Sequence, residues 1–93
     1  MIACNDDRCA VQGPVTAEQV LALLAQGAQL FTGPRVTVDL SGVTEVDSSA
    51  LSLLLEWRRE AERNGREIRY RNLPASLKSL AELYGVTELL GEA

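Results

Sequence analysis

Asp47, Ser48 and Ser49 form the stretch whose residue types could carry chemistry. They stand between an alternating apolar run, RVTVDL, and a leucine-rich run, ALSLLLEW, which predicts a strand-to-helix corner. A serine at such a corner could be a nucleophile, a phosphate acceptor, a partner contact or a helix cap. The simplest interpretation is the cap, because Asp and Ser oxygens accept hydrogen bonds from the free N–H groups of a first helical turn.

A catalytic role for these serines is disfavoured by the rest of the sequence. A serine nucleophile needs a nearby base, yet the chain has no histidine, and its one lysine, Lys78, is not adjacent to them. The Gly-x-Ser-x-Gly, Walker and Gly-x-Gly-x-x-Gly patterns are absent. We therefore expect no enzymatic activity. The alternative, a serine hydrolase, would show ester turnover that Ser48→Ala abolishes.

Metal, cofactor and nucleic-acid binding are also not expected. Cys4 and Cys9 lie five residues apart without a second pair, which is not a zinc spacing. A local disulfide is possible, but two reduced cysteines are the preferred expectation for a cytoplasmic protein. The net charge is −4, and the arginines between Arg58 and Arg71 alternate with glutamates, which favours solvated ion pairs over a phosphate-binding face.

The elements that position the corner follow from hydrophobic periodicity. Ninety-three residues suit one domain, spanning 1–93. Two short apolar runs at the N-terminus predict a weak hairpin, and Thr16 with Gln19 forms a capping-box pattern that opens a helix. The later elements are expected as a strand at 35–40, a helix at about 48–64, a strand at 67–71, a helix at 74–84 that Gly85 ends, and a helical turn in VTELL. The order ββαβαβα predicts an α/β domain in which helices flank a small mixed sheet.

The helix after the corner has more apolar surface than one sheet contact requires. Its apolar residues cover an arc of about 200° on a helical wheel. We expect one flank to stay exposed, either Leu53 with Trp57 or Leu55 near Arg58, unless the third helix covers it. An exposed apolar flank beside a polar helix start would suit a docking surface. The candidate partner-binding residues are Asp47, Ser48, Ser49, Ser52, Leu53 and Trp57.

Ser48 is also a candidate phosphorylation site. A phosphoryl group there would lie at a helix N-terminus, where the amides and the helix dipole favour an anion. Glu45 and Asp47 would oppose it by like charge. Phosphorylation would therefore change the local field sharply, as a switch at a protein interface requires.

Membrane association is expected only through a partner. No run reaches the roughly 18 apolar residues that a bilayer span needs. The N-terminus MIACNDDR lacks the pattern of a secretory signal. These features predict a cytoplasmic protein.

The stretch VTVDLSGVTEVDSSALSLLLEW resembles the STAS domain family, which includes anti-sigma factor antagonists and the cytoplasmic tails of sulfate transporters. The resemblance runs from about Cys9 to Leu90 and implies a small sheet flanked by helices. In anti-sigma factor antagonists, a partner kinase phosphorylates the serine after Asp, which corresponds to Ser48. In Mla phospholipid-transport systems, a free-standing MlaB-like subunit binds the ABC ATPase subunit at the cytoplasmic face of the inner membrane.

The C-terminal half resembles the Mla branch more closely, through LPASLKSLAELYGV. The resemblance implies a non-enzymatic regulatory or assembly subunit of a phospholipid-transporting ABC complex that maintains outer-membrane lipid asymmetry. Its implied partner is the ATPase subunit. The alternative is an anti-sigma factor antagonist, whose partners are a serine kinase and an anti-sigma factor; the serine pair Ser48-Ser49 is closer to that branch.

Overall fold

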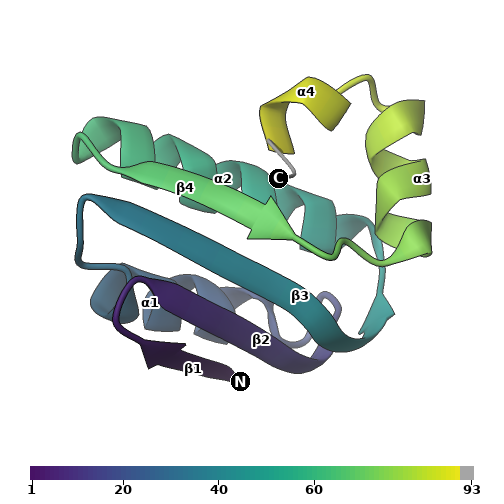
Figure 1. Ribbon diagram of the computed structural model, residues 1–93. Coiled ribbons are helices and arrows are strands. Elements are labelled where there is room, and N and C mark those ends of the chain that lie inside the picture. The colour runs from purple at the N-terminus through teal and green to yellow at the C-terminus, as the bar shows by residue number, and fades with distance from the viewer. Residues whose placement is uncertain (91–93) are drawn as a thin grey trace.

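Strands and helices alternate in the computed structural model, which describes residues 1–90 (Figure 1). The predicted order ββαβαβα is confirmed, and the VTELL segment adds a last helical turn. The elements are β1 (Ile2–Asn5), β2 (Arg8–Val15), α1 (Val20–Leu30), β3 (Arg35–Val46), α2 (Ser48–Arg63), β4 (Glu67–Arg71), α3 (Ala75–Leu83) and α4 (Thr87–Leu90).

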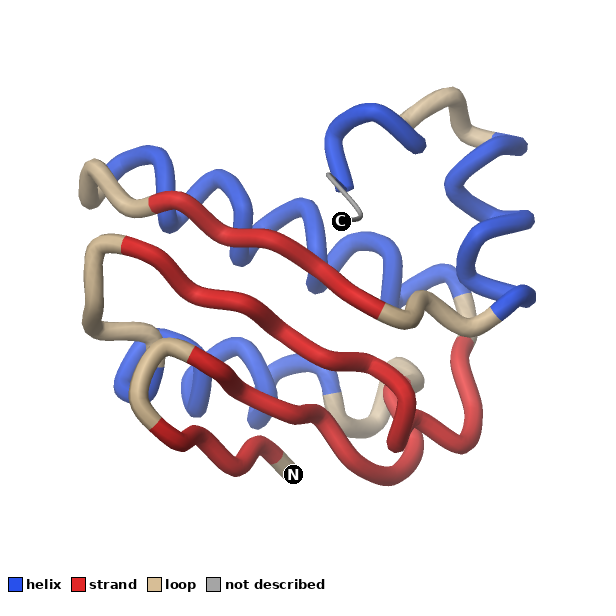
Figure 2. Tube along the Cα trace, viewed as in Figure 1, coloured by secondary structure: helices blue, strands red, loops and turns tan. Residues whose placement is uncertain are grey.

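The strands form one mixed sheet in the order β1-β2-β3-β4. β1 is antiparallel to β2, whereas β2 is parallel to β3 and β3 is parallel to β4. Figure 2 shows α1 and α2 behind the sheet, while no described element crosses the face toward the viewer. Because β2 and β3 are parallel, their C-terminal ends lie side by side at the same end of the sheet, where Val15 pairs with Val46. The predicted strand-to-helix corner, which begins at Asp47, directly follows this end of β3.

The alternation predicted for β3 decides which side chains reach the core. Val36, Val38 and Leu40 are buried on the helix side, whereas Thr37 and Asp39 are half-buried. From β4, the Tyr70 side chain is also buried, and its hydroxyl donates a 2.7 Å hydrogen bond to the Leu54 carbonyl oxygen in the middle of α2. This bond ties α2 to the sheet.

Helix boundaries agree with the sequence at the C-terminal ends and differ at the start of α1. The two predicted stop residues, Gly65 and Gly85, have φ of 65° and 70°, a left-handed conformation that glycine adopts without strain. Thr16 and Gln19 do interact, through a 2.7 Å bond between Thr16 Oγ1 and Gln19 Oε1, but this contact closes a turn, and α1 begins only at Val20. None of the described helices is long and apolar enough to span a bilayer.

Cys4 and Cys9 form a disulfide, so the expectation of two reduced thiols is wrong. The two residues are direct partners in the antiparallel register of β1 and β2, with their Cα atoms 4.0 Å apart. Asp6 has φ 57° in the turn, a conformation that Asp tolerates better than most residues. The tight hairpin therefore places both sulfur atoms on the same face of neighbouring strands.

Candidate functional site

The candidate site is the corner between β3 and α2, which we call the elbow (Asp47, Ser48 and Ser49). Asp47 is the N-cap of α2 and has extended backbone angles, φ −136° and ψ −170°. Its Oδ1 accepts a 2.8 Å hydrogen bond from the Ser49 N–H, as the capping interpretation predicts. Its Oδ2 accepts a 3.1 Å bond from the Ala17 N–H in the loop between β2 and α1. Asp47 therefore joins two segments that are thirty residues apart in the chain.

The carboxylate of Asp47 is held in its charged form. The Ala17 N–H lowers the pKa of Asp47 most, the small degree of burial opposes this, and the Ser49 N–H and hydroxyl lower it further. A negative charge consequently stands beside Ser48 at neutral pH. Any anion added to Ser48 would experience repulsion from Asp47 together with attraction to the helix N-terminus.

The serines of the elbow differ in exposure. Ser48 is exposed, whereas Ser49 is half-buried and its N–H is used in the cap. Ser52 lies one turn after Ser48 and is also exposed, and residues four apart share a helix face. The structure therefore places Ser48 and Ser52 together on the outer face of α2.

Leu53 and Trp57 do not form an exposed flank. Their exposed fractions are 2% and 3%, so the sequence-based assignment of these two residues to a surface is wrong. α1 covers Trp57, whose ring meets the Phe31 ring edge-on with centroids 5.0 Å apart. The other predicted flank, Leu55 near Arg58, agrees better with the structure. Leu55 is half-buried and follows Ser48 and Ser52 along the outer side of α2.

No hydrogen bond to the Ser48 hydroxyl is present within residues 1–90, and the sequence supplies no histidine to act as its base. In the same range, no group of three or more His, Cys, Asp or Glu side chains is arranged to hold a metal ion. The exposed hydroxyl groups of Ser48 and Ser52 suit hydrogen bonding to a partner protein.

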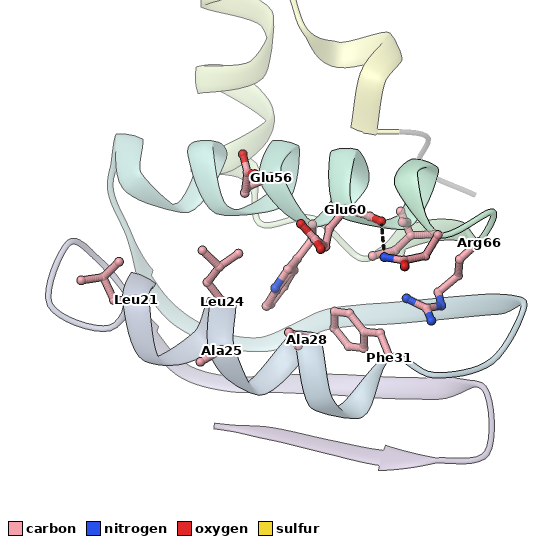
Figure 3. A pocket seen from close by; sticks show the side chains of 13 residues that line it. Leu21, Leu24, Ala25, Ala28, Phe31, Glu56, Glu60 and Arg66 are labelled. Carbon is pink, nitrogen blue, oxygen red and sulfur yellow. Dashed lines mark hydrogen bonds between the residues drawn. The ribbon is translucent and has the colours of Figure 1, made fainter.

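A groove of about 390 Å³ between α1 and α2 was not predicted from the sequence (Figure 3). Leu21, Leu24, Ala25 and Ala28 of α1 line it, with Glu56 and Glu60 of α2 opposite. Leu21 is 78% exposed. The signal in the sequence was the apolar stripe of α1, which is wider than its contact with the sheet requires.

A family model described as "Mlab, STAS domain" matches residues 2–91. The chain belongs to the STAS domain family. The resemblance inferred from the Asp-Ser-Ser stretch is therefore confirmed, and the match covers nearly the whole chain. No curated protein matched the chain in a sequence comparison.

Solved STAS-type structures share the fold of this STAS domain at low sequence identity. The anti-sigma factor antagonist SpoIIAA in its unphosphorylated form is 16% identical, with a TM-score of 0.76 over 100% of this chain and 86% of that one. The phosphorylated form of the Bacillus cell fate determinant SpoIIAA is 14% identical, with a TM-score of 0.71 over 100% and 89%. A sulfate transporter family protein from Wolinella succinogenes is 17% identical, with a TM-score of 0.72 over 91% and 70%.

Proposed function

We propose that this STAS domain is a non-enzymatic regulatory or assembly subunit of an ABC-type phospholipid transporter that maintains outer-membrane lipid asymmetry. It would bind the ATPase subunit and reach the cytoplasmic face of the inner membrane only through that complex. The family model described as "Mlab, STAS domain" supports this branch of the family. The small size of the domain and the absence of a membrane-spanning helix among residues 1–90 are compatible with it.

The proposed docking surface is the elbow with the adjoining outer face of α2. The observation that carries it is the exposure of Ser48 and Ser52 on one face, next to the half-buried Leu55. Asp47 fixes the backbone of this surface through two hydrogen bonds, so a partner would meet a preorganised corner. Leu53 and Trp57 would support this surface from below, because both belong to the core.

Co-purification with the ATPase subunit tests the proposal. Ser48→Arg and Ser52→Arg place long cations on the proposed surface without touching the core, whereas Leu53→Asp would put a charge among buried side chains and confuse unfolding with lost binding. Gln29→Arg is the matched control, because Gln29 is exposed near the C-terminal end of α1. Retention of the ATPase by Gln29→Arg and its loss with Ser48→Arg would support the proposal. Equal retention by all variants would contradict it.

A second candidate is an anti-sigma factor antagonist that serine phosphorylation switches. The fold likeness to SpoIIAA, which has been solved in phosphorylated and unphosphorylated forms, favours this alternative. Ser48 is exposed and follows Asp47, so a kinase could reach its hydroxyl. Incubation with a cognate serine kinase followed by mass spectrometry separates the two functions. Stoichiometric phosphate on Ser48, absent from Ser48→Ala, would favour the switch.

A further inference from the structure

The position of β1 in the sheet depends mainly on its pairing with β2. Within the described residues it pairs only with β2, as the outermost strand of the sheet, and Ile2 is its one buried residue. Backbone bonds between Met1 and Gln12 extend the ladder by one pair, with distances of 2.8 and 3.1 Å. The disulfide between Cys4 and Cys9 adds a covalent link to this short ladder, one pair away from the turn.

The two cysteines of the disulfide differ in exposure. Cys9 is only 3% exposed and belongs to the core, whereas Cys4 is half-buried at the sheet edge. Thiol–disulfide exchange requires a thiolate to approach one sulfur in line with the bond that breaks. Because Cys4 is the more exposed residue, we expect attack at Cys4 Sγ, with Cys9 Sγ as the leaving group.

We propose that Cys4 and Cys9 form a reversible redox site that latches β1 onto the sheet. A thiolate of a dithiol reductant forms a bond to Cys4 Sγ, the bond between Cys4 and Cys9 breaks, and Cys9 leaves as a thiolate that takes up a proton. The second thiolate of the reductant then attacks the mixed disulfide and releases Cys4. Two electrons and two protons pass to the protein, and the reductant becomes a cyclic disulfide.

Reduction removes the cross-link that holds the hairpin closed. A cross-link that closes a loop of about six residues lowers the conformational entropy of the open hairpin. Without this link, the equilibrium between the closed and the open hairpin should shift toward the open form by roughly 40-fold. Opening of β1 would expose the outer edge of β2, whose free N–H and C=O groups can then accept another strand. The redox state would thus decide whether this sheet edge is covered.

The biological setting of the latch rests on the proposed function, because that function places the chain at the cytoplasmic face of a membrane. Thiols are kept reduced in the cytosol, and the disulfides that do form there in mesophiles are usually transient, either catalytic or redox-sensing. A disulfide between two residues of one hairpin in such a protein is accordingly a candidate sensor. The latch itself is a property of the isolated chain and can be tested without any ATPase subunit.

Hydrogen exchange of the purified chain, oxidised and after treatment with dithiothreitol, tests the latch. Hydrogen-bonded pairs alternate along an antiparallel ladder, so the bonded Met1–Gln12 pair assigns Ala3–Ala10 and Asn5–Arg8 as the other bonded pairs. We expect the amides of Ala3, Asn5, Arg8 and Ala10 to exchange about 40-fold faster after reduction. Amides of α2 serve as the internal control and should change little. The double variant Cys4→Ser, Cys9→Ser should match the reduced protein with or without dithiothreitol.

Two results would overturn the latch. One is a disulfide that excess dithiothreitol leaves intact under native conditions, as thiol counting would show. The other is equal protection of the β1 amides in the oxidised protein, the reduced protein and the double variant. Neither result bears on docking at the elbow, since the ATPase is absent from the experiment.

Discussion

The replacement Gly27→Ala tests how closely α1 approaches α2. A Cβ atom at position 27 would lie 2.4 Å from Trp57 Nε1, 2.8 Å from Trp57 Cε2 and 2.9 Å from Phe31 Cε2. Non-bonded carbon atoms prefer separations of about 3.5–4.0 Å, so the rings must move by roughly 1 Å. Both rings are buried and pack edge-on against each other, which leaves them little room to move.

The expected loss of stability follows from two opposing effects. Overpacking of a filled core costs about 1–3 kcal/mol, while alanine in a helix interior is favoured over glycine by about 1 kcal/mol. Because the added Cβ would lie under 3 Å from three ring atoms, we expect an overpacking cost in the upper part of this range, about 2–3 kcal/mol, so the free energy of unfolding should fall by about 1–2 kcal/mol for Gly27→Ala. In a domain of this size, the melting temperature should fall by roughly 5–15 °C.

Urea unfolding followed by far-ultraviolet circular dichroism measures this loss. Gly33→Ala is the matched control, because its nearest contact would be an ordinary 3.7 Å from the Arg35 carbonyl oxygen, and it should be neutral or slightly stabilising. In a Trp57→Phe background the smaller ring removes part of the clash, so Gly27→Ala should cost less there. A Gly27→Ala protein at least as stable as the wild type would refute the close approach of α1 and Trp57.

Three further predictions concern Tyr70, Asp47 and Ser48. Tyr70→Phe removes the buried bond to Leu54 and should lower the free energy of unfolding by about 1 kcal/mol; an unchanged urea midpoint would contradict this. The folded-state pKa of Asp47 is lowered, so its contribution to stability is present above the unfolded value and is lost as pH falls through the folded value. Asp47→Asn should therefore differ most from wild type near neutral pH and converge with it in acid, whereas parallel acid-unfolding curves would count against the assignment. Ser48→Ala should leave the melting temperature within about 2 °C of wild type, because the side chain is exposed; a larger drop would indicate a structural role.

Local periodicity predicted the elements and the elbow, because both depend on neighbours in the sequence. The alternation of apolar residues in β3 and the Asp47 cap are short-range features, and the structure contains both. The width of an apolar arc, in contrast, does not specify which element covers it. α1 covers Trp57 because Gly27 has no side chain at the contact. The sequence contained this glycine, but its partner across the interface becomes evident only in three dimensions.

The cysteine pair and the Ala17 contact show a second limit. Whether two cysteines five residues apart meet depends on the hairpin register, and a one-residue shift would turn one of them to the opposite face. The second hydrogen bond of Asp47 likewise requires the loop after β2 to lie beside the end of β3. Both contacts are consequences of strand pairing that residue spacing alone does not determine.

The most direct test of the central claim is the dissociation constant of this STAS domain for the ABC ATPase subunit, measured by calorimetry with wild type, Ser48→Arg and Gln29→Arg. Both variants should melt within a few degrees of wild type, since both positions are exposed and a cation at the start of α2 costs only about 0.3–1 kcal/mol. Docking through the elbow predicts that Ser48→Arg weakens binding at least about tenfold, the loss expected when a central contact of an interface is disrupted, while Gln29→Arg leaves it unchanged. Equal dissociation constants for Ser48→Arg and wild type, at measurable affinity, would contradict the claim that the elbow is the docking surface.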